Sequence, residues 1–125
     1  MADHASIVRR CFAAYTNHDR AALEPLIAPE FRFTSPYDDA IDRTTYFERC
    51  WPGNERMRSV EVERAVPDGD DLYVTYTLVT KDGRKIHNTE RMSFTGDQIA
   101  SVEVFFGHER DADGRFRAMK KPDAR

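Results

Sequence analysis

This chain of 125 residues lacks the features of several common protein classes. It has only two cysteines, Cys11 and Cys50, and its four histidines show no metal-ligand spacing, so we expect reduced thiols and no bound metal. No apolar run is long enough to cross a membrane. The N-terminal residues also lack the basic and then apolar stretches of a secretory signal. We therefore expect a cytoplasmic protein.

Motifs for nucleotide binding and for nucleophilic catalysis are missing too. There is no Gly-rich phosphate loop and no G-x-S-x-G turn, so we expect no cofactor. The formal net charge is −3, from 19 basic and 22 acidic residues. Because backbone binding needs a dense basic patch, we expect neither nucleic acid nor an anionic membrane as partner.

The composition, 40% hydrophobic, predicts one folded domain with helices at its start. Val8, Cys11, Phe12 and Tyr15 form the apolar stripe of a first helix. Asp19 is a good N-cap for a short second helix through Leu26 and Ile27, shortened or kinked by Pro25 and closed by Pro29. Asp42 would cap a third helix that stops at 51–53, where proline and glycine follow Trp51.

Strand patterns dominate the rest of the chain. A short strand is expected at 31–34, ended by Ser35 and Pro36. After the third helix, segments 57–66, 71–80, 85–94 and 98–106 alternate with a period of two and are joined by short glycine turns. The prediction is an α+β fold, with N-terminal helices on a curved, mainly antiparallel sheet. Residues 1–107 would form the domain, and 108–125 a charged, loosely ordered tail.

The expected strand 85–94 carries two polar residues on its core-facing side. One face is wholly polar, so the other, with Ile86, Asn88, Glu90, Met92 and Phe94, must point inward. An amide and a carboxylate there either line a pocket or form a buried structural hydrogen bond. In a pocket, desolvation should raise the pKa of Glu90.

Other polar groups could join such a pocket. Tyr76 would place a hydroxyl among aliphatic side chains, as an ordinary core tyrosine or as a ligand contact. One of Asp38, Asp39 and Asp42 could be a general base, and we select Asp39, although all three also suit loop or cap positions. Tyr46 and Trp51 could pack on the sheet, contact a ligand, or do both.

The other face of strand 71–80 favours contact with a second subunit. Tyr73, Thr75, Thr77 and Val79 are neither charged nor strongly apolar, which suits a sheet-to-sheet homodimer as well as a plain solvated face.

Three segments resemble the SnoaL-like branch of the nuclear transport factor 2-like superfamily. They are 17–19 after the first helix (Asn-His-Asp), 31–36 (Phe-Arg-Phe-Thr-Ser-Pro) and 95–102 (Thr-Gly-Asp-Gln-Ile-Ala-Ser-Val). The resemblance spans about residues 5–107 and implies a cone-shaped α+β fold and a homodimer. This fold, which includes ketosteroid isomerase, hosts many activities and also non-catalytic domains.

The resemblance also suggests site residues. The steroid isomerase mechanism uses an aspartate base and an oxyanion hole built from a tyrosine and a protonated aspartate. These positions correspond here to Ser35, Cys11 and Glu90, so only the last keeps a carboxyl group and a steroid isomerase is not expected. Two hypotheses follow. The chain is a cofactor-free acid–base enzyme (isomerase, cyclase, dehydratase or hydrolase) for a small, partly apolar metabolite, with Glu90 and Asp39 as catalytic residues. Alternatively, it is a non-catalytic ligand-binding or dimerisation module.

Overall fold

The computed structural model describes residues 3–118. Helices come first: α1 (His4–Thr16), α2 (Arg20–Leu23) and the 3-10 turn η1 (Glu24–Leu26). A hairpin of β1 (Ile27–Ser35) and β2 (Asp38–Asp42) precedes α3 (Arg43–Arg49) and the 3-10 helix η2 (Trp51–Arg56). The long strands β3 (Met57–Asp68), β4 (Asp71–Thr80), β5 (Lys85–Thr95) and β6 (Gln98–Arg110) follow, and β7 (Phe116–Arg117) is last.

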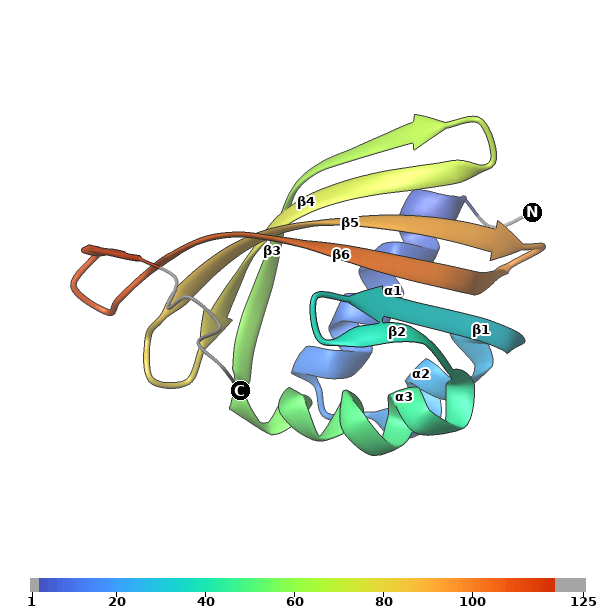
Figure 1. The fold of residues 1–125 in the computed structure, drawn as a ribbon, viewed down its shortest axis with the longest axis horizontal. Coiled ribbons are helices and arrows are strands. Elements are labelled where there is room, and N and C mark those ends of the chain that lie inside the picture. Colours follow the sequence, from blue (N-terminus) through green and yellow to red (C-terminus); the bar gives the residue numbers. More distant parts are fainter. Residues whose placement is uncertain (1–2, 119–125) are drawn as a thin grey trace.

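The strands form one strongly curved sheet, and the helices lie against its concave side (Figure 1). The order across the sheet is β2-β1-β6-β5-β4-β3, with β7 paired to β6. All neighbours are antiparallel except β1 and β6. The expected α+β fold and its meander of long strands are confirmed. In the parallel pair, β1 lies beside β6, the edge strand of the meander opposite β3.

The two expected caps form as the sequence indicates. The carboxylates of Asp19 and Asp42 accept hydrogen bonds from the backbone N–H groups of Ala22 and Thr45. The second helix is shorter than expected, because α2 ends at Leu23 and Pro25 lies in η1, where its missing N–H costs nothing. At the third helix, α3 ends at Arg49 and the chain continues as η2 through residues 51–53 rather than stopping there.

The β1–β2 hairpin differs most from the structure expected from the sequence. Pro29 does not close a helix but lies within β1, where the pairing with β6 is irregular and no ladder bond is lost. The acidic segment expected to be a loop is β2, paired with β1 through Arg32–Asp42 and Phe33–Ile41. Asp and Ala have low strand propensity, so pairing with β1 overrides the local preference.

The ordered sheet extends past residue 107. β6 runs to Arg110, and β7 returns to pair with it at Glu109 and Arg110. The described part of the expected tail therefore contains a hairpin, while residues 119–125 lie outside the described range. The domain boundary stays a prediction.

The core lies between the helices and the concave face of the sheet. Its fully buried side chains come from α1, α2, β1, β4, β5 and β6 and include Ile7, Leu23, Phe31, Leu72, Met92 and Ile99. Towards the β4–β5 hairpin this core opens into a cavity. Among the described residues, no helix is long and apolar enough to cross a membrane.

Candidate functional site

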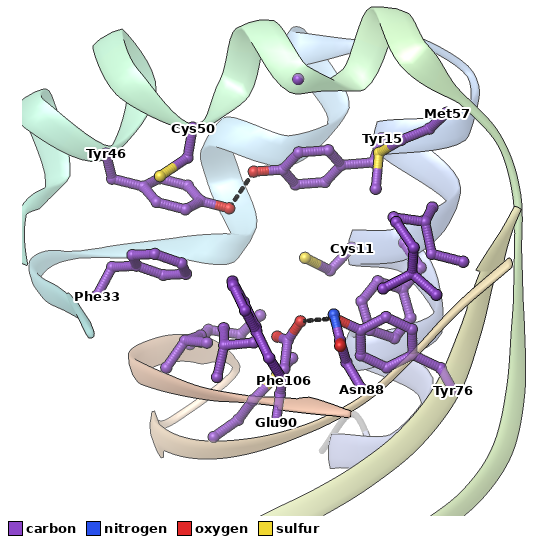
Figure 2. Close-up of a pocket in the computed structure, with 18 of the residues that line it drawn as sticks. Cys11, Tyr15, Phe33, Tyr46, Cys50, Met57, Tyr76, Asn88, Glu90 and Phe106 are labelled. Carbon is purple, nitrogen blue, oxygen red and sulfur yellow. Dashed lines mark hydrogen bonds between the residues drawn. The ribbon is translucent and has the colours of Figure 1, made fainter. Parts of the chain in front are cut away.

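A cavity of about 450 Å³ lies between α1, α3 and the concave face of the sheet. Most of its wall is aromatic or aliphatic: Phe12, Ile27, Phe31, Phe33, Met57, Leu78, Ile86, Met92, Ile99, Val102, Val104 and Phe106. Its inner polar groups fall on two facing walls. Figure 2 shows Tyr15 and Tyr46 reaching in from the helices, Tyr76, Asn88 and Glu90 opposite them, and the Cys11 thiol in between.

The sheet wall holds a carboxyl group inside a hydrogen-bond network. β4 and β5 place Tyr76 directly opposite Asn88 and two pairs away from Glu90, on the same face of the sheet. The Tyr76 hydroxyl donates to Glu90 Oε2, and Asn88 Nδ2 donates to the Tyr76 oxygen at 3.4 Å. Asn88 Oδ1 accepts from the backbone N–H of Gly107 at 3.2 Å. The strand alternation expected for β5 is thus confirmed, and both polar residues face the cavity.

Burial sets the protonation of this carboxyl group. Desolvation raises the pKa of Glu90 to about 7, although the hydrogen bond from Tyr76 acts in the opposite direction. The upward shift expected from the sequence is confirmed. Near neutral pH both the acid and the carboxylate are populated, and this suits a group that must both accept and donate a proton.

The helix wall presents two phenols. The hydroxyls of Tyr15 and Tyr46 are hydrogen-bonded to each other, and burial raises the pKa of both well above the usual range. Both therefore stay neutral. Within residues 3–118 neither hydroxyl has another hydrogen-bond partner, and only one of the two protons can lie between them. The pair thus retains one O–H donor for a ligand.

Five of the residues expected at the site line the cavity: Glu90, Asn88, Tyr76, Tyr46 and Cys11. Cys11 is only 6% exposed, and burial raises the pKa of its thiol. It is therefore a protonated, apolar-like wall group rather than a nucleophile.

Three expected residues lie elsewhere. Asp39 is exposed on β2, because strand alternation turns it away from the neighbouring Asp38. Ser35 is not in the wall, and its hydroxyl donates to Asp38 Oδ2 at 2.8 Å. Trp51 packs against the Tyr15 ring, 5.0 Å between centroids, behind the wall.

None of the three aspartates considered as bases lines the cavity. Asp38 is ion-paired with Arg49 at 2.8 Å, and Asp42 caps α3. The selection of Asp39 as a catalytic residue finds no support in this geometry, because the hairpin that holds it was taken for a loop.

Sequence reasoning missed Tyr15, Arg56 and Arg84 as lining residues. Tyr15 was assigned to the apolar stripe of the first helix, where its hydroxyl gave no separate signal. The two arginines come from η2 and from the turn before β5, and both line the cavity. Arg84 is paired there with Asp82 and Glu109. Only their proximity in the fold identifies them.

Metal ligands do not gather here. Among residues 3–118 no group of three or more His, Cys, Asp and Glu side chains is arranged to hold a metal ion.

Comparison with known proteins gives the family and the fold. The model of the SnoaL-like domain matches residues 8–117. No curated protein matches the chain.

Three solved structures illustrate the shared fold. A protein of unknown function from Cytophaga hutchinsonii, described as NTF2-like, has a TM-score of 0.69 at 18% identity, over 86% of this chain and 92% of its own. A candidate polyketide cyclase from Sinorhizobium meliloti has a TM-score of 0.66 at 21% identity, over 80% of this chain and 94% of its own. A candidate ketosteroid isomerase from Kribbella flavida has a TM-score of 0.67 at 17% identity, over 95% of this chain and 82% of its own. Identities this low support the fold alone.

Proposed function

This chain belongs to the SnoaL-like domain family, and from that premise we propose that it is a cofactor-independent acid–base catalyst for a small, mostly apolar carbonyl compound. Glu90 is the group that transfers the proton. Tyr15 and Tyr46 bind the carbonyl oxygen, and Asn88 and Tyr76 support Glu90. The rest of the wall supplies apolar contacts, and a cavity of about 450 Å³ suits a molecule of one to three rings.

The main support for this proposal is that a carboxyl group and a phenol pair lie on opposite walls of the cavity. Glu90, with a pKa of about 7, faces an unused phenolic O–H across an apolar space. A carboxylate can take a proton from the carbon next to a carbonyl group while the phenol donates a hydrogen bond to the carbonyl oxygen. The electron pair of the broken C–H bond then forms an enolate, and Glu90 returns the proton at the same or another atom.

Such a proton transfer is the shared step of isomerisation, aldol-type cyclisation and dehydration. Two structural neighbours carry the names polyketide cyclase and ketosteroid isomerase, and both names denote keto compounds. We do not propose the steroid reaction itself, because Ser35 lies outside the cavity and Cys11 is a weak donor.

A second candidate function is a non-catalytic ligand-binding module. It is favoured by one observation: Ser35, at the position that corresponds to the base of steroid isomerases, is engaged with Asp38 and Tyr37 in the first hairpin. In that case Glu90 would recognise a ligand rather than transfer its proton.

Deuterium exchange into simple ketones separates the two functions without knowledge of the substrate. We would incubate 1-tetralone and 1-indanone with the protein in deuterium oxide and follow the loss of the α-proton signal by NMR. The protein is expected to accelerate exchange, and Glu90→Gln should remove about 100-fold or more of that acceleration. Glu61→Gln is the matched control, since Glu61 is exposed on β3.

The outcomes are distinct. Exchange that persists in Glu90→Gln would contradict the role of Glu90. Saturable binding of the ketones without exchange would favour the ligand-binding module, and failure of both ketones to bind would contradict the proposed ligand class.

A further inference from the structure

The amide of Asn88 is held in one orientation by the protein backbone. β5 and β6 lose their regular pairing between Ile86 and Asn88, and at this irregularity the Gly107 N–H donates to Asn88 Oδ1. A peptide N–H can only donate, so the atom that faces it must be the amide oxygen. The approach requires glycine, because a Cβ at residue 107 would lie 2.0 Å from the His87 carbonyl oxygen.

The direction of every later hydrogen bond follows from this orientation. With Oδ1 facing Gly107, the Asn88 Nδ2 group faces Tyr76, and an amide nitrogen can only donate. The Tyr76 oxygen is therefore an acceptor towards Asn88. Its own proton has one acceptor among the described residues, Glu90 Oε2. If Glu90 donated instead, the Tyr76 proton would be left without a partner in an apolar wall, a costly arrangement.

We propose that this hydrogen-bond chain, in which each group donates to the next from Asn88 through Tyr76 to Glu90, keeps Oε2 of Glu90 as an acceptor. Oε1 is then the atom that exchanges a proton with the ligand. Oε1 has no hydrogen-bond partner among residues 3–118 and is not among the fully enclosed polar atoms. The inference rests on the proposed function, and it assigns Asn88 and Tyr76 as positioning residues.

Apart from burial, the hydrogen-bond chain is the main effect on the pKa of Glu90. α1 contributes Cys11 and Tyr15, α3 contributes Tyr46, and β4 contributes Tyr76, all neutral near pH 7. β6 places Val104 opposite Glu90. The cavity wall also holds two cations, Arg56 and Arg84. Burial and the Tyr76 hydrogen bond account for the pKa of Glu90, and neither arginine contributes to it.

The sign of a pKa change tests the direction of the chain. The Glu90 carboxyl carbon would be titrated by ¹³C NMR in the ligand-free protein and in Tyr76→Phe, which keeps the ring packed on Phe12. Loss of a donor to the carboxylate should raise the pKa of Glu90 by about one to two units. If Glu90 donated to Tyr76, the same variant would lower it. A lowered or unchanged pKa would overturn the proposal.

The matched control is Tyr46→Phe, which removes another buried phenol of the same cavity that is not bonded to Glu90. Its Glu90 pKa should stay within about 0.3 units of the original value, a free-energy change well below that of one hydrogen bond. An equal rise in both variants would show that general polarity, not the chain, sets the titration.

Asn88→Asp provides a second test that does not depend on the folding of Tyr76→Phe. The substituted carboxylate can accept from both Gly107 and Tyr76, so it draws the Tyr76 proton away from Glu90. The pKa of Glu90 should rise here too, because Glu90 loses the Tyr76 donor and also gains a like charge nearby. This variant therefore tests the hydrogen-bond chain through its failure, since an unchanged or lowered pKa would contradict it.

These titrations are independent of catalysis. If the pKa of Glu90 responds as expected but ketone exchange fails in the original protein, the proposed function is wrong and the proposed hydrogen-bond direction is supported. If exchange depends on Glu90 but the Tyr76→Phe shift has the opposite sign, the function is supported and the hydrogen-bond direction is wrong.

Discussion

Burial of Glu90 must couple the protonation of one residue to the stability of the whole fold. Its pKa is about 7 in the folded protein and near the ordinary glutamate value when unfolded, so the folded state binds the proton more tightly. The stabilising effect is therefore present at low pH. It is lost as the pH rises from about 4.5 to about 7.

This coupling predicts how the difference in unfolding free energy between the original protein and Glu90→Gln depends on pH. Relative to Glu90→Gln, which has no such proton, the original protein should lose about 3 kcal/mol of unfolding free energy between pH 4.5 and pH 8. Urea unfolding at several pH values measures this difference, and the other titrating groups cancel in it. A difference that stays constant with pH would show that Glu90 is solvated or ion-paired.

At the scale of secondary structure, the irregularity between β5 and β6 should be sensitive to one added methyl group. Gly107→Ala would place a Cβ against the His87 carbonyl oxygen, which belongs to the backbone of β5 and cannot move aside alone. We expect a loss of about 1–3 kcal/mol in unfolding free energy, as for other overpacked sites. Chemical denaturation measures the loss, and Gly69→Ala is the control.

The control separates two possible costs of replacing glycine. Gly69 lies in an open turn with no atom within 4 Å of an added Cβ, but it has a positive φ of 62°. Its replacement reports backbone strain alone. Equal urea-induced unfolding of the original protein and Gly107→Ala would show that the strands can separate freely at this point, contrary to the close approach described above.

Secondary structure also shows what the sequence could and could not predict. In β5 the alternation of side chains is strict, so the inward position of Asn88 and Glu90 followed from parity alone. The hairpin of β1 and β2 could not be foreseen in the same way. β2 has little apolar character and is held by its partner, and the irregular pairing of β1 tolerates Pro29.

The site was predictable only in part for a related reason. Residues on β4 and β5 were found because a polar group on a core face breaks a pattern. Tyr15 breaks none on the stripe of α1, and Arg84 lies in a turn, so neither could be assigned before the fold placed them at the cavity. Asp39 was selected for its charge in a segment whose strand alternation was not recognised.

At the scale of the whole molecule, the convex face of the sheet remains our proposed homodimer surface. Tyr73, Thr75, Thr77 and Val79 lie on it, and the Thr75 hydroxyl is bonded to that of Thr89. Charged groups flank these residues, because Arg64 is the β3 partner of Thr75 and the Thr77 hydroxyl donates to Glu63. Light scattering at micromolar concentration should give twice 14.5 kDa.

A charge at the centre of that face should disrupt the dimer. Near a two-fold axis Thr75→Arg brings like charges together, so the variant should run as a monomer. Glu30→Arg, on an exposed residue of β1, should not change the mass. A mass of 14.5 kDa for the original protein would reject the homodimer.

If Glu90 transfers protons in the cavity, its titration must appear in the pH profile of ketone exchange. If the carboxylate is the base, the logarithm of the exchange rate should rise with pH and level off near pH 7, the pKa of Glu90. The break should move upward in Tyr76→Phe, and the protein-dependent rate should vanish in Glu90→Gln. A profile with no break between pH 5 and 9, or one that survives in Glu90→Gln, would contradict the account.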